Sequence, residues 1–221
     1  MDLEGCAFPE DVLYDREGLS WARVETSGLV TVGITSILAA LAGRLTSIRP
    51  KPVGADLEQG RAVATLESGK YFGPVRAPVS GVVEATNGAV LVRPKACSED
   101  PYGEGWLVRL RPSRLPAERA DLLPATEAAD LLRGQIAALR VRCFAAFPDH
   151  EMFEIGTECA AVLVKLDELV GRIPAEEVVH IVSDDWTAPA EMANWSERTG
   201  HPVVDSRREG NLFHFLVRKV P

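Results

Sequence analysis

Short apolar runs broken by glycine and proline fill the first half of the chain. Five of these runs have the length and composition of β-strands: Val30–Ile34, Arg61–Leu66, Val79–Glu84, Val90–Arg93 and Trp106–Leu110. A helical segment over Ser36–Ala42 interrupts them, with Thr35 or Ser36 as its N-cap and Gly43 at its end. Many short strands with frequent turns predict a compact β-sandwich or barrel.

The pattern changes at about Pro112. Apolar residues then recur at helical spacing between Leu122 and Leu139, and Thr126-Glu127 after Pro124 predicts the start of a helix. We expect this helix to pack on the β domain and to lead into a linker near residues 143–150. The predicted domains are therefore residues 1–142 and 151–221.

The last part of the chain alternates strand and helix patterns. The expected elements are Met152–Ile155, Cys159–Val170, Val178–Val182, Ala188–Arg198, Val203–Ser206 and Leu212–Val217. Gly210-Asn211 suits a hairpin turn between the last two. The order β-α-β-α-β-β predicts a two-layer α+β sandwich with both helices on one face of the sheet.

Charge and composition narrow the function classes. The formal net charge is -8, which argues against nucleic acid and against anionic membrane surfaces as partners. No apolar run is long enough to span a membrane, and the acidic start does not resemble a signal peptide, so we expect a cytoplasmic protein. The four cysteines form no CxxC pair, which predicts no metal site. Four reduced thiols are favoured over a disulfide.

Candidate chemistry centres on the stretch Glu67-Ser68-Gly69-Lys70. The stretch follows a predicted strand, and the apolar strand Val79–Glu84 returns the chain to the core. Gly69 can adopt the positive φ that a tight turn needs, which would point the Lys70 amine into water. Exposed lysines are common, so Lys70 alone does not indicate a function; the evidence for one has to come from the surrounding sequence.

Three segments of the first domain resemble the glycine cleavage H protein, a lipoyl carrier, over about residues 12 to 140. They are Val30–Thr35, then Glu67–Lys70 with Ala77–Gly81, and Ser98–Leu107, which reads Ser-Glu-Asp-Pro-Tyr-Gly-Glu-Gly-Trp-Leu. The resemblance implies a lipoyl/biotinyl barrel-sandwich hybrid with flanking helices and lipoate attached covalently to Lys70. It also implies a lipoate ligase as partner, which reads the acidic Glu67.

The second domain resembles the TusA-like sulfurtransferase family over about residues 151 to 220. The matching stretches are Ile155–Cys159, Ser183–Trp186, Asn194–His201 and Phe215–Lys219. The resemblance implies a persulfide-carrying cysteine at Cys159, although the family's Cys-Pro-x-Pro motif is Cys-Ala-Ala-Val here. A helix N-terminus would favour the thiolate, with Arg218 and Lys219 as candidate cations. The alternative is that Cys159 is a small buried apolar residue.

The sequence is compatible with three functions. The first is a lipoyl carrier that works in sulfur transfer or sulfur oxidation with sulfur-transfer partner enzymes. The second is a glycine cleavage H protein that shuttles an aminomethyl group and uses its second domain for docking. The third is a non-catalytic scaffold. Departures from the H protein pattern at Ser36–Ala39 and Arg49–Gly54 favour the first function. In each, the chain is a carrier rather than a stand-alone enzyme, apart from sulfurtransferase activity at Cys159.

Overall fold

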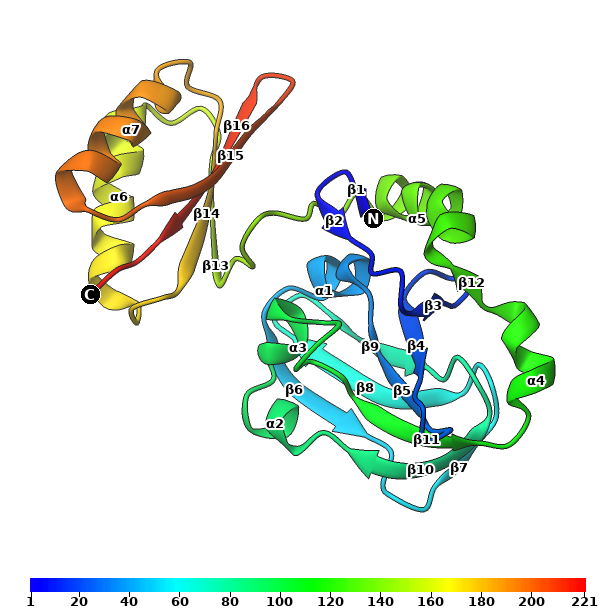
Figure 1. Cartoon of the computed structure of the whole chain (residues 1–221). Helices are drawn as coiled ribbons and strands as arrows, with labels where there is room; N and C mark the ends of the chain where they lie inside the picture. The colour runs from blue at the N-terminus through cyan, green and yellow to red at the C-terminus, as the bar shows by residue number, and fades with distance from the viewer. The chain divides into compact units, whose positions relative to one another are not determined.

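The computed structural model describes residues 1–221, which divide into two compact units between Cys143 and Phe144. Unit 1 is Met1–Cys143 and unit 2 is Phe144–Pro221 (Figure 1). None of the helices is long and apolar enough to cross a membrane. The domain limits expected from the sequence, 1–142 and 151–221, remain a prediction.

Unit 1 is mostly sheet. Its strands are β1 (Asp2–Leu3), β2 (Cys6–Ala7), β3 (Leu13–Tyr14), β4 (Ser20–Val24), β5 (Val30–Ile34), β6 (Leu45–Pro50), β7 (Asp56–Leu57), β8 (Ala62–Ser68), β9 (Phe72–Arg76), β10 (Gly81–Thr86), β11 (Val108–Pro112) and β12 (Leu123–Pro124). Its helices are α1 (Ser36–Ala42), α2 (Gly88–Val92), α3 (Ala96–Glu99), α4 (Leu115–Glu118), the 3₁₀ turn η1 (Arg119–Asp121) and α5 (Ala125–Leu139).

Two sheets form the sandwich of unit 1. The larger has the strand order β12-β3-β4-β5-β11-β10-β7, and the smaller has the order β6-β8-β9 (Figure 1). Their inward side chains form one apolar core, which includes the fully buried Val32, Leu66 and Leu110. A second cluster buries Trp21 together with Leu132 and Ile136 of α5. The expected β-sandwich and the expected packing of the helix after Pro124 are therefore present.

Helix α1 agrees with the sequence prediction in its bounds and both caps. The Thr35 hydroxyl accepts a hydrogen bond from the Leu38 backbone N–H at 3.5 Å, and Gly43 ends the helix at φ 68°. The predicted strand over Val90–Arg93 is wrong, because this run lies in and just after the short helix α2. Asn87 caps α2 by accepting a hydrogen bond from Ala89 N–H, so a local side-chain contact outweighs the β-branched composition.

Unit 2 has the element order β13 (His150–Glu154), α6 (Cys159–Arg172), β14 (Val178–Ser183), α7 (Ala188–Thr199), β15 (Val203–Glu209) and β16 (Leu212–Arg218). The sheet order is β13-β14-β16-β15, with β13 and β14 parallel and the other pairs antiparallel. Helices α6 and α7 share one core with the sheet, which includes Leu166, Trp195 and Ile181. This matches the β-α-β-α-β-β order expected from the sequence.

The second face of this sheet carries buried histidines. His180 Nε2 lies 3.0 Å from His214 Nδ1, and the two rings are stacked. The Phe144 ring packs on His180 with centroids 4.6 Å apart, so the segment after the unit boundary lies against its own sheet. These two histidines are packed against each other, and His180 also against Phe144.

The expectation of four reduced thiols is wrong for two of the cysteines. Cys6 and Cys143 form a disulfide across 137 residues of sequence, while Cys97 and Cys159 are free and buried. The disulfide joins β2 near the N-terminus to the last residue of unit 1. The sequence carried no local signal for it, because the pairing depends on how α5 returns the chain to the N-terminal hairpin.

The disulfide makes the unit boundary testable with trypsin. Arg140 ends α5 in the left-handed region at φ 51°, and both Arg140 and Arg142 are exposed, so we expect the first cuts after these residues. The two fragments should stay together on a non-reducing gel, since Cys143 remains joined to Cys6. They should separate after reduction. Separation without reductant would contradict the disulfide, and first cuts within the strands of unit 1 would contradict the boundary.

Candidate functional site

Lys70 lies in the turn that connects β8 to β9, and its side chain is exposed. Glu67 pairs with Phe72 across the hairpin, and the Ser68 backbone N–H donates to Tyr71 O at 2.8 Å to close the turn. The expected exposed position on a β-hairpin turn is confirmed. The expected strand over Val79–Glu84 corresponds to β10 (Gly81–Thr86), which places Val83 in the core, but it belongs to the other sheet; the sequence missed β9 (Phe72–Arg76), which follows the turn directly.

The Ser68 side chain holds the turn in shape. Its hydroxyl accepts hydrogen bonds from the backbone N–H groups of Lys70 at 3.2 Å and Tyr71 at 3.0 Å. The same hydroxyl donates to Ala42 O at 2.6 Å, which anchors the turn to the last residue of α1. Gly69 does not take the positive φ expected of it, because this side-chain bonding shapes the turn instead. Sequence reasoning missed Ser68, and its place at the start of the turn was the available signal.

The lysine side chain runs over a glycine. A Cβ built on Gly43 would lie 2.4 Å from Lys70 Cε, so a residue with a side chain at this position would displace the lysine. The Gly43 carbonyl accepts a hydrogen bond from the buried Ser98 hydroxyl at 3.1 Å, which fixes this backbone. The Lys70 side chain therefore packs directly on the backbone at the end of α1, where no other side chain intervenes.

Glu67 lies in the same hairpin as Lys70, three residues before it. Its carboxylate pairs with Arg49 at 3.0 Å, and both side chains are substantially exposed. An ion pair of this kind contributes little to stability, so the carboxylate remains available to a partner. The structure thus places Glu67 and Lys70 on one accessible feature of unit 1.

Cys159 is the first residue of α6, as expected, and belongs to unit 2. Its backbone N–H donates to Asp185 Oδ2 at 2.7 Å, and its side chain is only 3% exposed. Burial raises the pKa of the Cys159 thiol to about 11, and the negative charges of Asp185 and Glu191 add to this effect. Hydrogen bonds from Thr187 and Cys159 backbone N–H groups hold the pKa of Asp185 below its usual value.

The expected stabilisation of the Cys159 thiolate is therefore wrong in direction. The backbone N–H at the start of α6 donates its hydrogen bond to the carboxylate of Asp185 and not to the Cys159 sulfur. The two candidate cations do not lie at the start of α6, where Cys159 is. Arg218 lies opposite Val178 in the pairing of β16 with β14, and Lys219 Nζ donates a hydrogen bond to Ile173 O at the other end of α6. The alternative that Cys159 is a buried apolar residue agrees better with its burial.

The raised pKa predicts slow alkylation of Cys159. The thiolate is the reactive form, so the rate at pH 7 should be low and should rise roughly tenfold per pH unit up to about pH 11. Replacing Asp185 by Asn should speed the reaction, because it removes one of the negative charges. Peptide-resolved labelling with iodoacetamide across pH measures both effects. A rate that levels off below pH 8 would contradict this assignment.

Comparison with known proteins decides the family of unit 1. The family model described as glycine cleavage H-protein matches residues 12–135, which is more than half of the chain. The chain belongs to the glycine cleavage H-protein family. Members of this family carry lipoate covalently attached to a lysine.

Individual H proteins agree with this assignment. Glycine cleavage system H protein 2 of Aquifex aeolicus is 42% identical over 142 residues, covering 64% of this chain and 88% of the relative. Probable glycine cleavage system H protein 2 of Saccharolobus solfataricus is 39% identical, covering 62% of this chain and 94% of the relative. The crystal structure of an H protein from Mycobacterium marinum aligns with a TM-score of 0.50 and 30% identity, over 56% of this chain and 97% of that chain.

The residues around Lys70 fit a lysine-linked group. The Lys70 side chain is exposed, its turn is fixed by Ser68, and Gly43 leaves room beneath the stem. The family match lies within unit 1, so it supports the lipoyl-carrier part of the sequence interpretation and does not extend to a TusA-like second domain.

Proposed function

We propose that this chain is a lipoyl carrier of the glycine cleavage H-protein type, with lipoate attached to Lys70. The supporting observation is the exposed position of Lys70 on the rigid β8–β9 turn, inside the region that matches the family. When bound, the lipoyl group supplies a disulfide that opens to an incoming nucleophile. Lipoate ligase and the lipoyl-dependent enzymes of the glycine cleavage system are the proposed partners.

The residues of this chain hold the attachment point rather than perform chemistry. Ser68 ties the turn to α1, Gly43 supports the lysine stem, and Glu67 presents a carboxylate for the ligase. Such a carrier moves a covalent intermediate between enzymes because the tethered group stays at high effective concentration near each docked partner.

The experiment that tests this function is a reconstituted glycine–bicarbonate exchange. Lipoylated chain is added to glycine decarboxylase, and incorporation of labelled bicarbonate into glycine is measured. We expect exchange with the lipoylated chain, none with the unlipoylated chain and none with Lys70→Arg. Equal exchange with lipoylated and unlipoylated chain would contradict the proposal.

Sulfur transfer is the second candidate, and a single observation favours it. Cys159 opens the first helix of a β-α-β-α-β-β unit, where the TusA-like resemblance places a sulfur-carrying residue. The burial and raised pKa of the thiol oppose it. If a Cys159→Ala variant accepts sulfur from a persulfide donor as well as the parent does, unit 2 is a docking module.

A further inference from the structure

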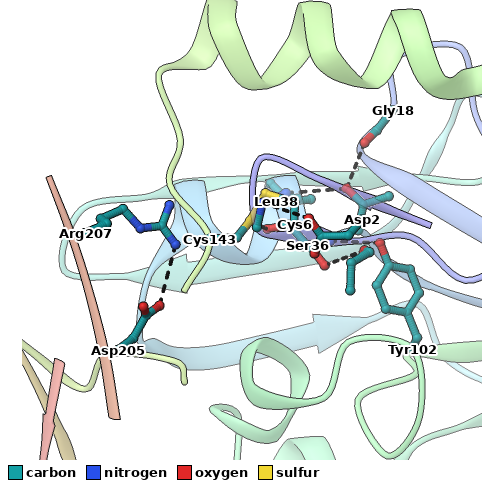
Figure 2. Close-up of a disulfide and its surroundings, with 12 residues drawn as sticks. Asp2, Cys6, Gly18, Ser36, Leu38, Tyr102, Cys143, Asp205 and Arg207 are labelled. Atoms are coloured by element: carbon teal, nitrogen blue, oxygen red, sulfur yellow. Dashed lines mark hydrogen bonds and ion pairs between the residues drawn. A yellow bond between two sulfur atoms is a disulfide. The ribbon is translucent and has the colours of Figure 1, made fainter. Parts of the chain in front are cut away.

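The disulfide of unit 1 lies at the N-terminal end of α1. Cys143 Sγ lies 3.8 Å from Ser36 O, and Ser36 Oγ donates to Ala7 O at 2.9 Å, one residue after Cys6 (Figure 2). Cys6 is fully buried, whereas Cys143 is partly exposed. An incoming thiolate can therefore reach the Cys143 sulfur, and the Cys6 sulfur is the leaving group.

Lys70 lies at the other end of the same helix. The lysine passes over Gly43, which ends α1, while Ser36 begins it. Seven residues of α-helix span about 10 Å. From Lys70 Cε, which lies over Gly43, eight bonds lead to the nearer sulfur of a lipoyl-lysine, or roughly 9 Å when extended, by analogy with the rise of an extended backbone. This length is close to that of α1, so an extended arm laid along the helix brings the tethered sulfurs to the Cys143 end.

The surface between the two ends offers little obstruction. Of the three partly exposed residues of α1, Ser36 and Ala40 have short side chains and Leu41, at the Lys70 end, has an apolar one; α1 carries no charged residue. Both ends belong to unit 1, and Tyr102, whose hydroxyl accepts a hydrogen bond from Ser36 N–H at 3.1 Å, holds the first turn of the helix in place (Figure 2). The separation is therefore fixed by one short, well-anchored helix.

We propose that the Cys6–Cys143 pair is an internal redox partner of the lipoyl group on Lys70. This inference rests on the proposed function. Cys143 Sγ forms a disulfide with one thiolate of the reduced arm, and Cys6 leaves as a thiolate that takes up a proton. The second arm thiol loses its proton, attacks the arm sulfur of the mixed disulfide and closes the dithiolane, and Cys143 leaves as a thiolate that takes up a proton. Two electrons pass from the arm to the cysteines, with no net change in protons.

The exchange makes the covalent link between Cys6 and Cys143 depend on the redox state of the lipoyl group. With the disulfide closed, the chain is joined to β2 at its last residue before unit 2. With the pair reduced, that covalent link is lost. The redox state of Cys6 and Cys143 therefore reports whether the lipoyl group has been reduced.

The test starts from a sample of the chain in which Lys70 is lipoylated and the Cys6–Cys143 disulfide is intact. Peptide mass spectrometry verifies the lipoylation. An NADH-dependent lipoamide reductase reduces the arm under anaerobic conditions, and acid-quenched samples are denatured and alkylated with N-ethylmaleimide. We expect Cys6 and Cys143 to become alkylated at least about tenfold faster than in unlipoylated chain treated identically. The free thiols Cys97 and Cys159 label in every sample and serve as internal standards.

Stoichiometry and concentration give two further readouts. Lipoylated chain should consume about two equivalents of NADH, and the lipoylated Cys6→Ser/Cys143→Ser variant about one. The rate should not depend on chain concentration if the exchange is internal. The inference is overturned if the disulfide survives in lipoylated chain, opens equally fast in unlipoylated chain, or opens at a rate proportional to concentration. Absence of lipoate from Lys70 would instead overturn the proposed function itself.

Discussion

Replacing Lys70 by Arg should abolish lipoyl incorporation and leave the fold unchanged. The guanidinium is not acylated by a ligase that forms an amide on a primary amine, even though the charge is kept. Lys70 is exposed, so the free energy of unfolding should change by less than about 0.5 kcal/mol. Intact mass after incubation with lipoate ligase, ATP and lipoate measures the first effect, and urea unfolding the second.

Lys51→Arg is the matched control, because Lys51 is also exposed and lies outside the β8–β9 turn. It should accept lipoate as the parent does. Incorporation into Lys70→Arg at the parental level would show that another lysine is the attachment site. A loss in both variants would point to a defect in ligase recognition rather than in the attached residue.

Trp21→Ala should have the largest effect on stability. Trp21 is fully buried, and its indole N–H donates to Ile34 O at 2.9 Å and to Pro101 O at 3.1 Å. A Cβ on Gly33 would lie 2.4 Å from the indole ring, which shows how tightly the ring fills its space against β5. Truncation leaves a cavity and two carbonyls without this donor, so we expect a loss of about 3–5 kcal/mol.

Urea unfolding of the full chain, followed by far-UV circular dichroism, measures this loss in the transition of unit 1. The control is Phe72→Ala, because Phe72 is also aromatic, lies in unit 1 and is 73% exposed, so its removal should cost less than about 0.5 kcal/mol. The packing assigned to Trp21 is incorrect if the two variants are equally stable.

Elements whose signals are local were predictable from the sequence. Helix α1 was found with its caps because Thr35 and Gly43 act within one turn of it. Strand β9 was missed because Gly73 and Pro74 break its pattern. Proline is tolerated there since β9 is an edge strand of the β6-β8-β9 sheet.

In the candidate sites, too, features set by local sequence could be predicted, and features set by distant contacts could not. The exposed turn at Lys70 follows from the short stretch Glu67–Lys70 together with the family resemblance. The Cys6–Cys143 disulfide and the burial of Cys159 depend on contacts between distant segments, as with Asp185 at the start of α6. Pattern and spacing could place Cys159 on a helix but could not predict its pKa.

Peptide mass mapping after treatment with lipoate ligase tests the central claim most directly. The chain has five lysines, Lys51, Lys70, Lys95, Lys165 and Lys219. The account predicts one lipoyl adduct per chain, located on Lys70. An adduct on any of the other four with Lys70 unmodified, or no adduct under conditions that load a known H protein, would contradict it.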